Sequence, residues 1–154
     1  MPSMNFKPRD PNFQQKVRDS FDQQQFMGHI GAQLTEVRPG YCEIRVPFQE
    51  SLTQQNAFFH AGVISTIADN AAGYAAFSLM AVNASILTVE IKLNFFSPGK
   101  GDMLIGRGQV LKSGKTLAVC RSDLFVVQNG EEKLCAAGQS TLIQLQETPN
   151  KSKS

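Results

Sequence analysis

A long stretch of small and apolar residues occupies the centre of the chain, from about Ala61 to Met80. Its apolar residues recur on nearly every side of a helix, and a helix of that kind is buried inside a fold. Asp69 stands about two turns into this stretch. A carboxylate on an otherwise apolar helix is costly to bury, so Asp69 requires either a polar partner or a chemical task.

Extended segments flank this helix on both sides. The residues of Tyr41–Phe48 alternate between apolar and polar, as in a half-buried strand, and a Pro-Gly turn joins them to Ala32–Glu36 as a hairpin. Leu87–Phe95 shows the alternation most clearly, with its apolar residues on one face. The opposite face carries Thr88, Glu90, Lys92 and Asn94. The remaining strands are predicted at Met103–Lys112, Thr116–Val127 and Lys133–Leu145.

An amphipathic helix is predicted near the N-terminus. Three apolar residues recur there every four positions: Phe13, Val17 and Phe21. Pro11 suits the first turn of such a helix, and Gly28 is a natural stop. The polar ends are expected to be loose tails of a single domain, namely residues 1–10 and 147–154 of the domain 1–154.

Together these elements predict one layered α+β domain. A single curled antiparallel sheet of five or six strands can bury the central helix, with the N-terminal helix as a cover. Gly106 and Gly108 predict a bend or bulge where their strand curves. An open curled sheet leaves edge strands, and a strand as regular as Leu87–Phe95 favours pairing with a second copy of the chain. We therefore expect a homodimer or a larger homo-oligomer.

Composition excludes several classes of function. The net charge is +2 and the Lys and Arg residues are scattered, which argues against nucleic-acid binding. No apolar run reaches the roughly 20 residues of a membrane-spanning helix, and no secretory signal is visible, so we expect a cytoplasmic protein without a membrane partner. Three cysteines without metal-binding spacing predict reduced core thiols, and two isolated histidines predict no metal or other cofactor.

Motifs around the central helix match the pattern of a known family. His60 is followed by Ala61-Gly62, Asp69 comes nine residues after this histidine, and Gln54 comes six residues before it. Two later segments match the central strand and the following hairpin of the same pattern, Leu87–Pro98 and Leu111–Ala118. With these motifs in order, the chain resembles a hotdog-fold acyl-CoA thioesterase, of the group that includes 4-hydroxybenzoyl-CoA and phenylacetic-acid-degradation thioesterases.

The resemblance covers most of the chain and implies both a fold and an activity. The fold is the hotdog, a curled antiparallel sheet around a long helix. The activity is hydrolysis of an acyl-CoA or aryl-CoA thioester to a free acid and coenzyme A. The family further implies a homodimer, or a homotetramer, with the active site across a dimer interface.

The resemblance assigns the reaction to the start and middle of the central helix. A helix N-terminus presents unpaired N–H groups and the positive end of the helix dipole, so Ala61 and Gly62 are the expected oxyanion hole. The family has glycine where this chain has Ala61, but the backbone N–H is retained. Asp69 is the expected general base or nucleophile, and the small residues around it leave room for a ligand.

Other residues are expected to assist. Gln54 would orient the attacking water or the thioester carbonyl, and Asn56 is a second candidate of the same kind. His60 would position the loop, with direct catalysis as the alternative. Thr88 occupies the place of a serine in related enzymes and would hydrogen-bond the substrate or Asp69.

A basic turn is the expected contact for the phosphates of coenzyme A. It comprises Lys112, Ser113, Gly114, Lys115 and Thr116. Lysine charges and backbone donors suit phosphate groups, although a solvated hairpin tip would have the same composition.

Two other functions remain open on this sequence. The first is an acyl-CoA-binding or regulatory protein that does not hydrolyse its ligand. The second is a hotdog dehydratase or hydratase, which would leave the thioester intact. The acyl group is not specified, because the aromatic residues near the helix could line a pocket or fill the core: Phe58, Phe59, Tyr74 and Phe77.

Overall fold

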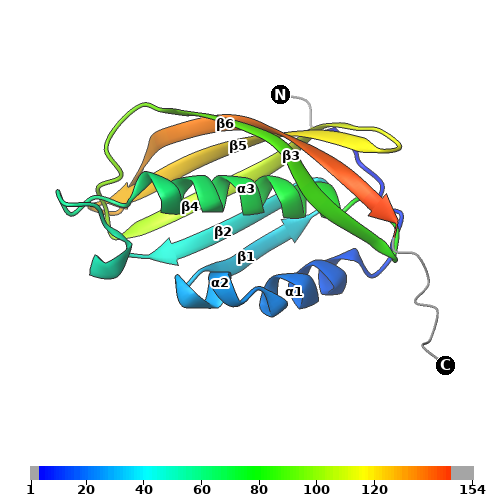
Figure 1. The fold of residues 1–154 in the computed structure, drawn as a ribbon, viewed down its shortest axis with the longest axis horizontal. Coiled ribbons are helices and arrows are strands. Elements are labelled where there is room, and N and C mark those ends of the chain that lie inside the picture. Colours follow the sequence, from blue (N-terminus) through cyan, green and yellow to red (C-terminus); the bar gives the residue numbers. More distant parts are fainter. Residues whose placement is uncertain (1–3, 147–154) are drawn as a thin grey trace.

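A computed structural model describes residues 4–146, and the predicted tail at 147–154 lies outside them. One antiparallel sheet curls around a long helix, α3, and two short helices lie beside the edge of the sheet formed by β1 and β2 (Figure 1). The helices are α1 (Phe13–Gln23), α2 (Gln25–His29) and α3 (Ala61–Phe77), with a 3-10 turn η1 (Glu50–Leu52). The strands are β1 (Gln33–Arg38), β2 (Tyr41–Pro47), β3 (Ala84–Phe95), β4 (Met103–Ser113), β5 (Leu117–Gln128) and β6 (Glu131–Gln146).

The six strands are ordered β1-β2-β4-β5-β6-β3, and every neighbouring pair is antiparallel. This arrangement confirms the predicted α+β architecture of a curled sheet around a central helix. The strand that follows α3 in sequence, β3, closes one edge of the sheet by pairing with β6. Helix α3 ends at Phe77, earlier than predicted, where the Ser78 hydroxyl donates to the carbonyl of Ala75 at 2.7 Å.

Gly106 and Gly108 bring β4 into direct contact with α3. A Cβ atom at Gly106 would lie 2.4 Å from the side chain of Ile67, and one at Gly108 would lie 2.1 Å from the backbone oxygen of Ala71. Of the predicted bend or bulge, a bulge is not found at these glycines, because the register of β4 shifts further along the strand, between Val110 and Lys112. The glycines instead allow the helix to approach the sheet closely.

A bulge in β3 changes the direction of Thr88. Thr88 pairs with Leu142, which is buried beneath α3, whereas Glu90 pairs with Thr141. Since Leu142 and Thr141 are neighbours on β6, their side chains point to opposite faces of the sheet. The prediction that Thr88 and Glu90 share a face is therefore wrong. The extra residue at Val89 turns Thr88 towards the helix.

The N-terminal helix is broken at Gln24 and resumes as α2, which continues through Gly28. The prediction of one helix that ends at Gly28 is thus corrected. Gln24 has extended backbone angles, φ −76° and ψ 104°, and its side chain reaches α3 to bond Asn70 and Tyr74. Asn70 and Tyr74 are far from Gln24 in the sequence, so no local sequence pattern indicates this break in the helix.

Residues 4–10 are anchored, which corrects the expectation of a loose N-terminus for this part. Asp10 is 4% exposed and its carboxylate accepts a hydrogen bond from the backbone N–H of Asn12 at 2.8 Å. Lys16 forms an ion pair with Asp10 at 3.8 Å. The ring of Phe6 packs against Gly40, which has a positive φ of 74° and no space for a side chain.

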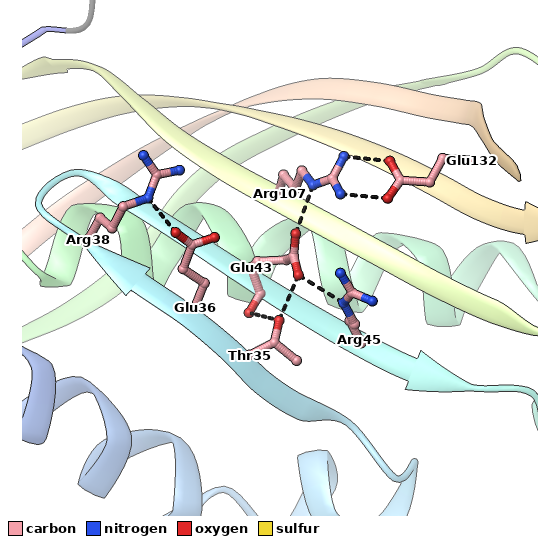
Figure 2. A network of polar contacts seen from close by, with 7 residues as sticks. All are labelled: Thr35, Glu36, Arg38, Glu43, Arg45, Arg107 and Glu132. Atoms are coloured by element: carbon pink, nitrogen blue, oxygen red, sulfur yellow. Dashed lines mark hydrogen bonds and ion pairs between the residues drawn. The ribbon is translucent and has the colours of Figure 1, made fainter. Parts of the chain in front are cut away.

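The face of the sheet opposite α3 carries an ion-pair network centred on Glu43 (Figure 2). Glu43 is 6% exposed, and its carboxylate accepts hydrogen bonds from Arg107 at 2.9 Å and from Arg45 and Thr35 at 2.8 Å each. Arg107 also forms a bidentate pair with Glu132, with both bonds at 2.7 Å. The network therefore links β1, β2, β4 and β6 across the outer face.

Candidate active site

The start of α3 is capped by His60. Its Nδ1 atom accepts a hydrogen bond from the N–H of Gly62 at 2.8 Å, and a Cβ atom on Gly62 would lie 2.9 Å from the same nitrogen. The Gly62 N–H therefore donates to His60, whereas we expected it to donate to the substrate as part of an oxyanion hole. Among the described residues, the N–H of Ala61 has no protein acceptor. Ala61 is exposed, so this N–H is the donor that the helix start offers to a ligand.

The loop before α3 brings Gln54 close to Ala61. Both residues line an open pocket of about 440 Å³, together with Phe95 at the end of β3 and Phe96 directly after it. The Gln54 side-chain oxygen accepts a hydrogen bond from the backbone N–H of Asn56, and this bond stabilises the loop. The Asn56 side chain is exposed and does not line the pocket.

Asp69 is half-buried on α3 and has one close polar partner. The Thr88 hydroxyl donates to Oδ1 of Asp69 at 2.6 Å, a distance typical of a strong bond to a carboxylate. The neighbouring hydroxyls of Ser65 and Thr66 bond backbone carbonyls one turn earlier in the helix. Neither hydroxyl is therefore bonded to the Asp69 carboxylate, which accepts from Thr88 and lines a pocket.

That pocket, of about 230 Å³, is open to solvent on one side and lies between α1, α3, β3 and β6. Asp69 and Thr88 line it, together with Ser20, Gln24, Asn70, Gly73, Tyr74, Ile86, Leu87 and Leu142. Of these, Ser20, Gln24 and Asn70 were not identified from the sequence. Asn70 directly follows the predicted Asp69, which is a weak signal, whereas no motif points to Ser20 or Gln24.

The two parts of the predicted machinery lie apart within one chain. Asp69 comes eight residues after Ala61 on a continuous helix, so their backbones are about 12 Å apart along its axis. Reacting atoms need to approach within about 3.5 Å of each other. One thioester carbonyl cannot therefore meet the Ala61 N–H and the Asp69 carboxylate of the same chain.

Every residue of the basic turn at 112–116 is exposed, and the turn lies at the other end of the fold from Ala61. Gly106 contacts α3 at Ile67 and Gly108 contacts it at Ala71, so β4 runs in the same direction as the helix. The turn that ends β4 then lies beyond the C-terminal half of α3, at the yellow hairpin in Figure 1. Within one chain the structure does not bring this turn to Ala61.

The edge strand β3 exposes a row of apolar side chains. Val89 is 60% exposed, and Leu87, Ile91 and Phe95 are also exposed, as is Phe96 directly after the strand. The outer edge of β3 has no strand partner among the described residues. Exposed apolar residues along an unpaired edge are typical of an interface with another chain.

Among residues 4–146, no three His, Cys, Asp or Glu side chains come together in a way that could hold a metal ion. Over the same residues, no helix combines the length and apolar character needed to cross a membrane. The three cysteines are buried and unpaired, which confirms their prediction as core thiols.

Comparison with known proteins gives consistent matches. Residues 56–133 match the thioesterase superfamily. A thioesterase family protein from Silicibacter pomeroyi, known from a crystal structure, is 44% identical with a TM-score of 0.87, over 88% of this chain and 99% of that one. Human acyl-coenzyme A thioesterase 13 is 33% identical over 70% of this chain and 76% of its own length.

A more distant structure supports the fold. The E. coli PaaI protein, from the phenylacetic acid degradation operon, superposes with a TM-score of 0.79 at 19% identity, over 89% of this chain and 96% of that one. At this identity the likeness concerns the fold alone. It agrees with the hotdog fold that the resemblance implies.

Proposed function

Because the chain belongs to the thioesterase superfamily and is a thioester hydrolase, we propose that it hydrolyses an acyl-coenzyme A thioester to a free acid and coenzyme A. The observation that carries this proposal is the Asp69–Thr88 pair, a hydrogen-bonded carboxylate in a pocket on the central helix. The human relative named as an acyl-coenzyme A thioesterase supports the same substrate class.

Asp69 supplies the reactive oxygen in this proposal. Thr88 occupies Oδ1, so Oδ2 remains available either to take a proton from water or to attack the thioester carbon. Attack places negative charge on the carbonyl oxygen, which a helix N–H and the positive end of the helix dipole stabilise. The C–S bond then breaks and coenzyme A leaves as the thiolate, which takes up a proton. If water attacks, the free acid forms directly; if Asp69 attacks, the acyl group remains on Asp69 as a mixed anhydride, which water then hydrolyses to the free acid.

The oxyanion donor and the carboxylate come from different copies of the chain. The 12 Å between Ala61 and Asp69 prevents one chain from supplying both, and the exposed apolar edge of β3 lies beside the Asp69 pocket. Pairing of two β3 edges about a two-fold axis would bring the partner subunit's Ala61 towards this chain's Asp69. The active unit is then a homodimer, and two such dimers can form a homotetramer.

Substitution of Asp69 tests the assignment. Asp69→Asn keeps the shape of the side chain and its bond with Thr88, but removes the negative charge. We expect thiol release from acyl-CoA substrates to fall by a factor of about 10² to 10⁴. The matched control is Asp22→Asn, because Asp22 is an exposed acid on α1 away from the pocket.

Colorimetric detection of free thiol measures the reaction for both variants, and circular dichroism checks that each is folded. If Asp69→Asn keeps the wild-type kcat, Asp69 is not the reactive group. If the wild-type protein binds acyl-CoA thioesters but releases no thiol from a panel of them, the non-catalytic binding function is correct.

A further inference from the structure

His60 caps α3 through a hydrogen bond that requires one particular form of its ring. Nδ1 of His60 accepts from the backbone N–H of Gly62 at 2.8 Å. An imidazole nitrogen can accept only while it carries no proton, and in the neutral ring the single proton then lies on the other nitrogen. The bond therefore identifies His60 as the neutral tautomer with its proton on Nε2.

The backbone of His60 is held on both sides of this cap. Its N–H donates to the carbonyl of Leu52 at 2.9 Å, and its carbonyl accepts from Val63 at 2.9 Å and from Ile64 at 3.2 Å. Its dihedral angles, φ −61° and ψ 139°, are those of a residue that caps a helix. His60 therefore joins η1 to the first turn of α3.

The cap also sets the direction of the Ala61 N–H, the donor that the helix start offers to a ligand. This N–H belongs to the peptide between His60 and Ala61, and the ψ angle of His60 fixes the orientation of that peptide. The bond from Gly62 to the His60 ring closes across the same peptide, so it restrains this angle. Without this bond, the Ala61 N–H is free to turn away from a carbonyl oxygen.

We propose that neutral His60 is a positioning residue that holds the Ala61 N–H for the reaction, and that protonation of its ring releases this donor. The added proton occupies Nδ1, so the Gly62 N–H loses its acceptor. The ring then carries a positive charge beside the positive end of the helix dipole, which further disfavours the capped geometry. Imidazole changes its charge between about pH 5 and 8, so mild acid is sufficient. This role of His60 rests on the proposed thioesterase function and adds a pH dependence to its oxyanion donor.

Within the described residues, no charged group is paired with the His60 ring. The elements next to it are η1, α3 and the segment between β3 and β4. They carry these charged residues: Glu50, Asp69, Lys100 and Asp102. None of them forms an ion pair or a hydrogen bond with the ring. In the proposed dimer the partner subunit's Asp69 also approaches this helix start and favours protonation of His60, and every variant below retains that carboxylate.

Three substitutions separate the cap from the charge of the ring. His60→Asn supplies an amide oxygen that caps a helix without gaining a proton, whereas His60→Ala supplies no acceptor. Gly62→Ala keeps His60, but its Cβ would lie 2.9 Å from Nδ1 and displace the ring. The matched control is His29→Asn, because the ring of His29 stacks on Phe26 and lines neither pocket of the candidate site.

The kinetic test measures kcat for an acyl-CoA thioester from pH 5 to pH 8.5. A side-chain cap shifts the equilibrium at a helix start by about fivefold. At pH 8, His60→Ala and Gly62→Ala should therefore lie at least about fivefold below His60→Asn. Protonation of Asp69 affects wild type and His60→Asn alike, so the ratio of their kcat values reports His60 alone. This ratio should fall by about fivefold between pH 8 and pH 5.5, and His29→Asn should follow the wild type.

Three kinetic results would contradict the proposed role. A ratio that is constant with pH would show that protonation of His60 does not control the donor. A ratio that rises in acid would show that the released Gly62 N–H serves the reaction better than the cap does. Equal kcat values of His60→Asn and His60→Ala at pH 8 would show that the cap does not position the Ala61 N–H.

Nuclear magnetic resonance tests the cap independently of hydrolysis. Long-range proton–nitrogen correlation spectra of the imidazole ring identify its tautomer, and backbone spectra report the Gly62 amide. We expect the His60 proton on Nε2 at pH 8. On acidification the Gly62 amide should shift together with the ring in the wild type and stay in place in His60→Asn.

These spectra would support the cap even if the protein releases no thiol from any substrate. A proton on Nδ1 at pH 8, or a Gly62 amide that shifts equally in wild type and His60→Asn, would overturn the role of His60 even if hydrolysis is fast.

Discussion

Glu43 is expected to stabilise the sheet in a pH-dependent way. Burial alone would raise the pKa of its carboxyl, but the hydrogen bonds from Arg107, Arg45 and Thr35 outweigh burial and lower this pKa from 4.5 to about 2. A carboxyl whose pKa is lower in the folded state favours folding when it is ionised. The perturbation is Glu43→Gln, which keeps the size of the side chain and removes its charge.

The magnitude follows from the two pKa values. Lowering a pKa from 4.5 to about 2 corresponds to about 3 kcal/mol of unfolding free energy at pH 7. This contribution is complete above the unfolded-state pKa and is lost as the pH falls towards 2. At pH 3 about half of it remains. We therefore expect the free energy of unfolding of the wild type to exceed that of Glu43→Gln by about 3 kcal/mol at pH 7 and by about half of that at pH 3.

Urea unfolding followed by far-ultraviolet circular dichroism measures both free energies, at one protein concentration because an oligomer's stability depends on it. The matched control is Glu36→Gln on the adjacent strand. Glu36 pairs with Arg38 at 2.6 Å, but the two side chains are 45% and 58% exposed. An exposed pair contributes about 0 to 1 kcal/mol, so this control should change little at either pH.

If the difference between wild type and Glu43→Gln is the same at pH 7 and pH 3, the ionised carboxylate is not the source of the stability. If Glu36→Gln lowers the free energy of unfolding as much as Glu43→Gln does, burial of the carboxylate is not the reason why Glu43 stabilises the fold.

Three further substitutions test the site, the packing and the assembly. Thr88→Val should lower kcat about tenfold or more in steady-state kinetics, since Asp69 loses its donor at 2.6 Å; an unchanged kcat would exclude a positioning role. Gly108→Ala should lower the thermal unfolding midpoint strongly or prevent folding, because its Cβ would overlap the α3 backbone, whereas Gly28→Ala, with open space around it, should be tolerated. Ile91→Lys on the exposed edge of β3 should give a smaller, inactive species in size-exclusion chromatography; an active protein of unchanged size would contradict the proposed dimer.

The order and type of the main elements could be predicted from local patterns in the sequence. The apolar residues of 61–77 recur on nearly all sides of a helix, and those of the later segments alternate, so each element carries its own local signal. The motif of His60 and Asp69 resembled a thioesterase family, and the match of residues 56–133 confirms that family. The roles of the individual site residues stay predictions.

The contacts among the site residues could not be predicted in this way, because they depend on how distant segments pack. A bulge at Val89 turns Thr88 to Asp69, and Gln24 leaves a helix to bond a tyrosine fifty positions away. His60 occupies the N–H of Gly62, which leaves Ala61 as the available donor. Each of these outcomes depends on contacts between distant segments, whose energies exceed local preferences and leave no periodic trace in the sequence. The helix was therefore predictable from its own residues, whereas the pocket beside Asp69 required the fold that surrounds it.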